Sequence, residues 1–503
     1  MNSKGYGSNS LAERAREVAL TLASWPSVTG SRDEADFPPR LVDMLSGFDK
    51  AWTEAIPGDP RRNVFALKRG RGRCTVVLTG HFDVVPVEDY GALKPLAFEA
   101  EKLLPEIVAR LWRTGENPLA LADFESGDFL PGRGLLDMKA GLAAGIAAME
   151  AYNGVANLLF IGVADEEDRS AGARAAVPLL PAIAAEHDLD IELVINLDAI
   201  SDQGDGTAGR VVALGSIGKQ LLTAFVVGKE AHACYPQDGA NAAYLGAELL
   251  IEFELAEELA EVSGTEIAAP PTALHAKDLK SGYNVTTPGQ SWLYWNTLQH
   301  RRSAGEVFDI ALMLARRAMA RAARKVKRDI PVMSYAELAA RVPQHELAEK
   351  AEQLGRRSDL DLPERCKLMT AHVWEKSGLS GPAVVMGFGS IPYPAVSLSD
   401  GGLENAIMVA VKPHGLAGVR YFPGISDMSF FGEASGDLSA AAANTPVWGS
   451  SFTIPEAAGY PCINIGPWGR DYHHWLERLE THHAFETLPR VLIAVIDAVL
   501  DRR

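Results

Sequence analysis

Four short apolar segments of this chain are each followed by side chains of the kinds that bind metal ions. The segments are rich in β-branched residues and bounded by glycine or proline, which is typical of central strands in a parallel sheet. They span residues 74–80, 157–164, 191–197 and 461–467. The side chains that follow them are His81 and Asp83, Glu166 and Glu167, Asp198, and His473 and His474. Because ligands of open α/β sheets bind at the carboxyl ends of the strands, the pattern predicts a metal-dependent hydrolase.

The length of the chain indicates how many domains to expect, and its charge and hydropathy argue against some kinds of binding partner. With 503 residues it is too long for one ordinary core, so we expect two or more domains. Its 48 basic and 65 acidic residues give a net charge of -17. This argues against nucleic acid as a partner, because phosphate binding needs a basic face. No apolar stretch approaches the length that spans a bilayer, so we expect no membrane partner.

The cysteines and the N-terminus indicate the compartment. The four cysteines are scattered and include no C-x-x-C pair: Cys74, Cys234, Cys366 and Cys462. We interpret all four as reduced and structural, which fits a cytoplasmic protein. The N-terminus has no basic-then-apolar signal pattern, and residues 10–25 are instead typical of an amphipathic helix.

Helical and strand-like segments alternate in the first 213 residues, which predicts an α/β domain. A charged segment, residues 93–122, interrupts this alternation; it has helical periodicity around 103–112 and no cluster of site-type residues. We interpret it as an insertion between two site loops. The expected catalytic domain comprises residues 1–213 and 336–503.

The intervening segment, residues 214–335, has the pattern strand-helix-strand-strand-helix-strand, which is typical of a small α+β sandwich. The expected elements are strand 221–227, helix 241–261, a hairpin of 284–287 with 291–295, helix 307–324 and strand 325–335. Pro288 and Gly289 supply the turn signal of the hairpin. We therefore expect a lid domain that is inserted into the larger domain.

The spacing of the strand-end residues suits a metal centre. His81 and Asp83 are two residues apart, so on an extended segment they point the same way. One can ligate a metal while the other holds the imidazole from behind. Asp137 lies in a glycine-rich turn, where a carboxylate can bridge two cations. Glu166 and Glu167 are adjacent, so one can ligate while the other faces bound water.

The charge balance favours two divalent ions. Asp137, Glu167 and Asp198 supply three negative charges against four positive ones, and a late histidine completes the set. The surplus positive charge favours a bridging hydroxide, because metal binding lowers the pKa of water to about 7. Mixed nitrogen and oxygen ligands suit zinc, although manganese or cobalt fits the same set.

These motifs together resemble the co-catalytic zinc peptidase and aminoacylase family, which includes acetylornithine deacetylase, succinyl-diaminopimelate desuccinylase and the glutamate-releasing carboxypeptidase. The matching segments occur in the family's order and span most of the chain: 80–86, 132–141, 165–167, 231–232 with 239–242, 284–285, 424–427 and the histidine pair. Within the family, the chain is most similar to the branch of the arginine-utilisation protein RocB. That similarity lies in residues 81–91, the long insertion and residues 466–471.

The resemblance implies a role for each ligand-type residue. His81 and Asp198 would hold one zinc ion, Glu167 and a C-terminal histidine would hold the other, and Asp137 would bridge the two. His232 matches the lid histidine that, in the family, reaches across a dimer to polarise the scissile carbonyl. The resemblance therefore also implies a homodimer formed through the lid.

Further roles follow from the same resemblance. Asp83 would orient the imidazole on its strand, and Glu166 would be the general base that takes a proton from metal-bound water and passes it to the leaving amine. The family's last motif is His, three residues, then Glu. His473 with Glu477 has this spacing, so we prefer His473 to His474 as the ligand.

For three candidate site residues, the sequence leaves two possible roles open. His232 is a polarising group or a satisfied surface histidine, and Asp427 is a substrate-binding residue or a turn residue. Asn284 is an oxyanion donor that contacts substrate or a hydrogen bonder at a strand edge. Relatives usually carry an aspartate and an arginine in the strand after Asn284, but residues 292–297 contain neither. Recognition of a substrate α-carboxylate is therefore open.

We accordingly expect a two-domain metallohydrolase. Its α/β catalytic domain, with a mixed, largely parallel central sheet, is interrupted by an α+β sandwich lid. The expected substrate is a small molecule with an amide bond: an N-acyl amino acid, a dipeptide or an arginine-related compound. Two alternatives are a two-metal phosphoesterase and a metal-binding relative without catalytic activity.

Overall fold

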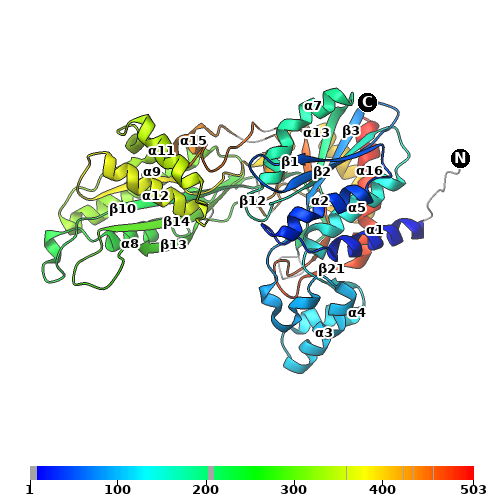
Figure 1. Cartoon of the computed structure of the whole chain (residues 1–503), viewed down its shortest axis with the longest axis horizontal. Helices are drawn as coiled ribbons and strands as arrows, with labels where there is room; N and C mark the ends of the chain where they lie inside the picture. Colours follow the sequence, from blue (N-terminus) through cyan, green and yellow to red (C-terminus); the bar gives the residue numbers. More distant parts are fainter. Residues whose placement is uncertain are drawn as a thin grey trace. The chain divides into compact units, whose positions relative to one another are not determined.

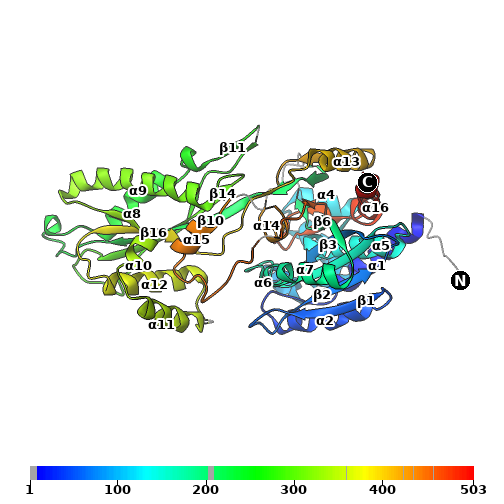
Figure 2. The same cartoon turned by 90° about the horizontal axis from the view of Figure 1, so that it is seen from above.

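The computed structural model divides into two compact units, which are described separately (Figures 1 and 2). The structure describes residues 8–201, 209–264, 266–357, 359–422, 424–433, 436–456 and 458–502. The first unit comprises Met1–Ser216, Val396–Ala434 and Pro455–Arg503, and the second comprises Ile217–Ala395 and Ser435–Ile454. Among the described residues, every helix is too short or too polar to cross a membrane.

An eight-stranded sheet forms the centre of the first unit. Its strands are, in order, β1 (Lys50–Ala55), β2 (Arg62–Lys68), β5 (Asn157–Val163), β3 (Cys74–His81), β6 (Asp190–Asn196), β19 (Cys462–Asn464), β8 (Val211–Ala213) and β18 (Ala417–Val419). β5, β3, β6 and β19 are consecutive parallel neighbours, whereas β1, β2 and β5 pair antiparallel. The parallel neighbours lie in the four apolar segments of the sequence, so the predicted mixed, largely parallel sheet is confirmed.

The helices of the first unit are α1 (Ser8–Ala23), α2 (Arg32–Met44), α3 (Ala100–Thr114), α4 (Pro118–Ser126), α5 (Ala140–Ala151), α6 (Ala171–Ala176), α7 (Leu180–Glu186), α13 (Gly401–Val411), α14 (Met428–Phe431) and α16 (Leu488–Leu500). α5 packs on β3 and β5, and α1 and α16 pack on α5. A Cβ atom on Gly141 of α5 would lie 2.0 Å from the carbonyl oxygen of Leu197. Only glycine therefore allows α5 to come this close to the end of β6, and this places the turn before α5 beside Asp198.

A smaller sheet and the predicted insertion lie at one end of the first unit. The sheet is made of β4 (Phe129–Pro131), β21 (Arg478–Glu480), β20 (Trp468–Arg470) and β7 (Ile200–Ser201); elsewhere in the unit, β9 (Gly215–Ser216) pairs with β17 (Val396–Ser397). The predicted insertion, residues 93–122, falls within a longer inserted segment, which folds as a 3-10 element, η1 (Glu88–Leu96), followed by α3 and α4. Both helices pack against β4 (Figure 1).

The second unit is built on a five-stranded sheet with helices on both faces (Figure 2). Its strands are, in order, β13 (Thr272–Asp278), β14 (Gln290–Gln299), β10 (Gly218–Val227), β16 (Ala383–Phe388) and β15 (Val332–Ser334). Its helices are α8 (Ala242–Phe253), α9 (Ala304–Val326), α10 (Tyr335–Ala339), α11 (Gln344–Gly355), α12 (Leu362–Lys376) and α15 (Ser439–Asn444). Leu222, Trp295 and Met386 share one core with α8 and α9. On the other face, a Cβ atom on Gly387 would meet the Cβ of Tyr335 in α10 at 3.5 Å.

The second unit extends beyond residue 335, where the sequence analysis ended the lid. β16 lies between β10 and β15 and pairs with both, so the sheet needs a strand that the sequence analysis assigned to the catalytic domain. α10, α11 and α12 lie in the chain between β15 and β16. Helical periodicity alone does not reveal which sheet such helices cover, and this is why the boundary differs.

Three local predictions for the second unit are wrong. β14 pairs with β13 rather than with residues 284–287, which contribute one isolated bridge, from Thr286 to His232. β13 is a largely exposed edge strand without an apolar run, so the sequence pattern did not mark it. The helix predicted to reach residue 261 ends at Phe253, and Leu255 turns the chain with a φ of 58°. The strand predicted over residues 325–335 is mostly wrong, because within that range only β15 (Val332–Ser334) is a strand.

Candidate metal centre

Three parallel neighbours of the first unit deliver polar side chains to the same edge of the sheet. β3 ends at His81, β5 leads into Glu166 and Glu167, and β6 leads into Asp198. The Nε2 atom of His81 lies 3.7 Å from Oδ1 of Asp198 and 3.9 Å from Oε2 of Glu166. The structure therefore brings together residues that are far apart in the sequence, as the strand order requires.

The ring of His81 has a fixed orientation. Its Nδ1 lies 3.0 Å from the backbone oxygen of Asp83. A carbonyl oxygen can only accept, so Nδ1 carries the hydrogen and Nε2 is left to face the carboxylates. Nε2 lies 3.2 Å from Oδ1 of Asp137, and the imidazole is almost fully buried. This backbone-oriented imidazole is the usual arrangement of a histidine ligand in a metal site.

The carboxylate of Asp137 lies between two imidazoles. Oδ1 faces Nε2 of His81 at 3.2 Å, and Oδ2 faces Nε2 of His473 at 3.1 Å. Asp137 belongs to the turn η2 (Leu135–Lys139), directly before α5. The two oxygens of one carboxylate thus face different nitrogen donors, which is the geometry of a bridging ligand.

His473 also approaches Glu167. Its Nε2 lies 3.1 Å from Oε1 of Glu167, so this imidazole has a carboxylate on either side. His473 and the neighbouring His474 are both exposed, but Nδ1 of His474 accepts the backbone N–H of Leu476 at 3.3 Å. The structure therefore places His473, and not His474, beside Asp137 and Glu167.

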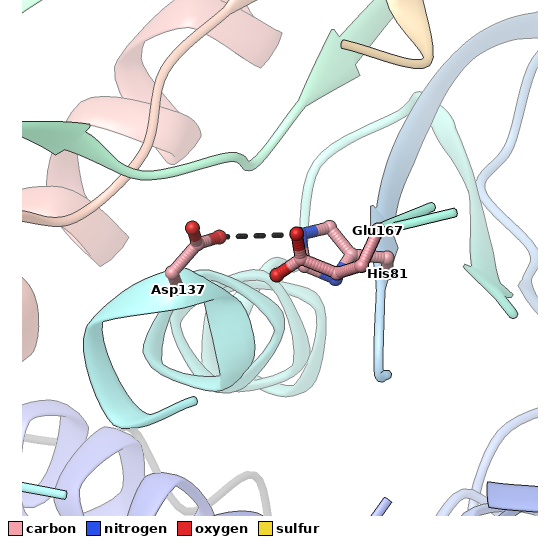
Figure 3. A group of neighbouring side chains, drawn as sticks. All are labelled: His81, Asp137 and Glu167. Carbon is pink, nitrogen blue, oxygen red and sulfur yellow. Dashed lines mark hydrogen bonds and ion pairs between the residues drawn. The ribbon is translucent and has the colours of Figure 1, made fainter. Parts of the chain in front are cut away.

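Ligand atoms of His81, Asp137 and Glu167 all lie within 4.8 Å of one another. Figure 3 shows the two carboxylates and the ring turned toward one another. Because Nδ1 of His81 carries its hydrogen, a neutral His81 ring would turn its Nε2 lone pair toward the negatively charged Oδ1 of Asp137 at 3.2 Å. A proton or a metal cation must therefore lie between these two atoms, because electron-rich atoms repel each other in a buried site. The nitrogen and oxygen donors fit zinc and similar divalent ions.

The same charges shift the pKa values of the histidines. Burial opposes the charged form of His81, but Asp137 and Asp198 outweigh it and raise the pKa of His81 well above its ordinary value. Burial also opposes the charged form of His473, yet Asp137 and Glu167 raise its pKa to about 10. The cluster thus stabilises positive charge at both imidazoles.

Asp83 holds the loop that follows β5. One of its carboxylate oxygens accepts the backbone N–H of Glu166 at 3.1 Å, and the other accepts that of Glu167 at 3.3 Å. The hydroxyl of Thr29 donates to the second oxygen at 2.9 Å. Asp83 therefore orients the two glutamates as well as the imidazole that its backbone oxygen holds.

The carboxyl group of Glu166 is buried beside the cluster. Burial raises the pKa of Glu166 well above its ordinary value; the charge of His81 opposes this shift, and that of Asp427 reinforces it. A raised pKa of this kind is typical of a carboxyl group that accepts and releases a proton during a reaction.

Several residues that shape the centre gave no signal in the sequence analysis. Arg61 is nearly buried and binds Asp165, which directly precedes Glu166, and Glu34, which accepts the backbone N–H of Asp165. Asn464 of β19 accepts the backbone N–H of Asp198 at 3.1 Å and donates to its backbone oxygen at 2.9 Å. They act through contacts between distant segments, so no spacing rule identifies them.

The remaining predicted site residues are Asp427, which lies within electrostatic range of the cluster, and His232 and Asn284, which do not belong to the first unit. Asp427 of the first unit is buried, and burial raises its pKa to about 7. His232 and Asn284 belong to the second unit and are exposed. His232 accepts the backbone N–H of Cys234 at 3.2 Å, and Asn284 accepts that of Thr286 at 3.1 Å.

The sequence profile of peptidase family M20/M25/M40 matches residues 77–444 of this chain. The chain belongs to this family. It is accordingly a metallohydrolase of the peptidase and amidohydrolase type, and the family resemblance seen in the sequence is confirmed.

Two relatives from Bacillus subtilis (strain 168) match over nearly the whole length. YqjN is 32% identical and the match covers 96% of both chains. RocB is 29% identical, with 96% of this chain and 94% of RocB covered. The branch similarity noted in the sequence is therefore confirmed, although YqjN shares more identity than RocB does.

Solved structures of two peptidases have the same fold. Aminopeptidase PepT from Bacillus cereus ATCC 10987 has a TM-score of 0.57 at 13% identity, and the match covers 97% of this chain and 99% of that chain. YXEP from Bacillus subtilis, described as a dinuclear metal-binding peptidase of the M20 family, has a TM-score of 0.51 at 11% identity. That match covers 98% of this chain and 99% of YXEP. The predicted fold class is confirmed.

Proposed function

We propose that this M20 protein hydrolyses the amide bond of a small N-acyl amino acid, dipeptide or arginine-related compound, using two divalent metal ions. The observation that carries the proposal is the Asp137 carboxylate, whose two oxygens each face a different imidazole at 3.2 and 3.1 Å. A single-metal site would not need an acidic group placed symmetrically between two nitrogen donors. YXEP, which shares the fold, is described as binding a dinuclear metal.

The donor set divides into two halves around Asp137. His81 and Asp198 would hold one ion, and Glu167 and His473 would hold the other. The distances support this division, because His81 Nε2 lies 3.7 Å from Asp198 and His473 Nε2 lies 3.1 Å from Glu167. Zinc suits these donors best, and cobalt or manganese would fit the same residues.

The residues around the centre handle the proton. When bound, the two cations would lower the pKa of water and polarise the scissile carbonyl. Glu166 would take the proton from the attacking water and deliver it to the leaving amine as the C–N bond breaks. Asp83 fixes Glu166 for this transfer, since it accepts the backbone N–H of Glu166 at 3.1 Å.

Substrate contacts are proposed from the resemblance to the family. His232 would polarise the scissile carbonyl across a homodimer that forms through the second unit, and Asn284 and Asp427 would bind substrate. The relation to RocB supports an arginine-related compound. The first arginines that follow β14 in the chain are Arg301 and Arg302. Their backbone N–H groups bind Glu261. We also propose that the enzyme acts in the cytoplasm.

A substrate panel tests the proposal. The protein would be loaded with zinc, cobalt or manganese and assayed on N-acyl amino acids and dipeptides, including arginine and ornithine derivatives, with p-nitrophenyl phosphate as the phosphoesterase control. We expect metal-dependent amide hydrolysis that falls by about 10²–10⁴-fold in Glu166→Gln, because the general base is lost.

Three outcomes would contradict the proposal in whole or in part. Phosphate-ester hydrolysis without amide hydrolysis would show a two-metal phosphoesterase. Stoichiometric metal binding without turnover of any substrate would support a non-catalytic relative. Full amide activity in Glu166→Gln would remove the role of that carboxylate.

A further inference from the structure

The insertion of the first unit contacts two loops of the proposed metal centre. Its elements η1, α3 and α4 lie in the chain between the segment of His81 and the turn of Asp137. The apolar side chains of Leu103, Ile107 and Leu111 are buried along α3. The insertion is therefore packed against the unit, and its polar contacts have fixed partners.

One contact path runs from the insertion to the bridging carboxylate. Asp89 of η1 binds Nη2 of Arg133 with both oxygens, at 3.0 and 3.1 Å. Nη1 of Arg133 donates to Oε2 of Glu477 at 2.9 Å. The other oxygen of Glu477 accepts the backbone N–H groups of Leu136 at 3.2 Å and Asp137 at 3.4 Å. Asp89 is exposed, but Arg133 and Glu477 are almost fully buried, so the inner part of this path is shielded from solvent.

A second path runs from α4 to the loop that carries His473. Asp123 accepts two hydrogen bonds from Nη1 of Arg470, at 2.9 and 2.8 Å, and one from Nε of Arg478 at 2.8 Å. Arg478 also binds Asp471 and donates to the backbone oxygen of Leu476 at 3.2 Å. Asp123 thus anchors both ends of the loop.

This loop needs such an anchor. Asp471 and His473 have φ angles of 53° and 64°, a left-handed conformation that is uncommon for residues other than glycine, although aspartate and histidine adopt it more often than most. Arg110 of α3 adds a third contact, because its guanidinium lies 3.9 Å from the ring centroid of Trp475. Trp475 is buried and lies two residues after His473.

We infer that the insertion of residues 88–127 is a positioning element for the metal centre: Asp123 and Arg110 hold the His473 loop, and Asp89 holds the Asp137 turn through Arg133 and Glu477. The inference rests on the proposed metal centre. None of these insertion residues belongs to the proposed set of metal ligands; they act through the ligands that they hold. Residues that orient ligands in this way set metal affinity by 10–100-fold.

Metal titration of a matched pair of variants tests this inference. The full-length protein would be stripped with a chelator and titrated with Zn²⁺ by calorimetry and with Co²⁺ by absorption. We expect Asp123→Ala to lower the affinity for one of the two ions by about 10–100-fold and to change the Co²⁺ absorption spectrum. The more conservative Asp123→Asn keeps an acceptor and should lose less affinity.

Glu101→Ala is the matched control. Glu101 lies on α3 and binds Arg16 of α1 at 2.8 Å, so it joins the insertion to the unit without contacting either loop. We expect it to leave both metal affinities and the Co²⁺ spectrum unchanged. An equal loss in Glu101→Ala would overturn the inference in favour of a general loss of stability.

The remaining outcomes separate this inference from the proposed function. Wild-type affinity for both ions in Asp123→Ala would overturn the positioning role. Failure of the wild-type protein to bind any metal would overturn the metal centre itself. If Asp123→Ala does not fold, Arg110→Ala takes its place; it removes the contact with the ring of Trp475 and an ion pair with Glu116. This variant must bind one ion more weakly, and wild-type affinity for both ions would overturn the inference.

Discussion

Each oxygen of the Asp137 carboxylate has an imidazole as its neighbour, and this arrangement sets the residue-scale chemistry of the centre. His81 and His473 hold positive charge more readily than a free histidine, because carboxylates surround them. A metal ion that binds here must displace those protons, so metal affinity and pH are coupled.

A histidine outside the centre gives a pH prediction at the same scale. His483 is buried, and its Nε2 donates to the backbone oxygen of Gly466 at 3.2 Å. Burial lowers the pKa of His483 to about 4. In the unfolded chain His483 has an ordinary pKa and is protonated below about pH 6.5, whereas in the folded protein it stays neutral down to about pH 4. His483 therefore lowers the free energy of unfolding by about 1.4 kcal/mol per pH unit as the pH falls from 6.5 toward 4.

Thermal unfolding of variants between pH 4 and 7 measures this effect. We expect the decline toward acid pH to become shallower in His483→Asn than in the wild type. The adjacent His482 is two-thirds exposed, and His482→Asn is the control that should keep the wild-type slope. Identical pH profiles for His483→Asn and the wild type would contradict the prediction.

The chosen histidine ligand shows how far single residues could be predicted. The spacing of His473 and Glu477 favoured His473, and the structure places it beside Asp137 and Glu167. The partner of Glu477, Arg133, was not predicted, because the two are 344 positions apart and only the fold brings them together.

At the scale of elements, the loop after β5 depends on a buried ion cluster. Arg61 binds Glu34 and Asp165, and both carboxylates are almost fully buried. It also binds Asp59. Glu166 and Glu167 of the centre directly follow Asp165, so the ion cluster fixes the position of the backbone that carries them.

Removal of the guanidinium tests the cluster. We expect Arg61→Met to lower the free energy of unfolding by about 3–5 kcal/mol, because it leaves two buried carboxylates without their cation. Arg62→Met is the control: Arg62, the next residue and the first of β2, is exposed, and it bonds to Thr53 at 2.7 Å. Denaturant unfolding of both variants gives the comparison, and an equal, small loss in both would contradict this account.

The elements that could be predicted were those with a strong local pattern. β3, β5 and β6 are wholly or largely buried and read as apolar runs in the sequence. β13 could not be predicted, since its exposed edge position leaves it polar, and its partner β14 was therefore given a wrong neighbour. Local pattern identifies buried strands; pairing depends on contacts that the pattern does not contain.

At the scale of the whole molecule, the chain forms its first unit from three separate stretches. The last stretch returns β19 to the side of β6 and brings His473 beside Asp137. The order of motifs along the sequence predicted that the last stretch rejoins the first unit. It did not predict the extent of the second unit, because β16 joins the sheet of that unit only after three helices.

The most direct test of the central claim is an anomalous diffraction map of crystals grown with Zn²⁺. The account predicts two peaks, one beside each oxygen of the Asp137 carboxylate, with His81 next to one and His473 next to the other. A single peak, or two peaks that both lie on one side of Asp137, would contradict a bridged two-metal centre.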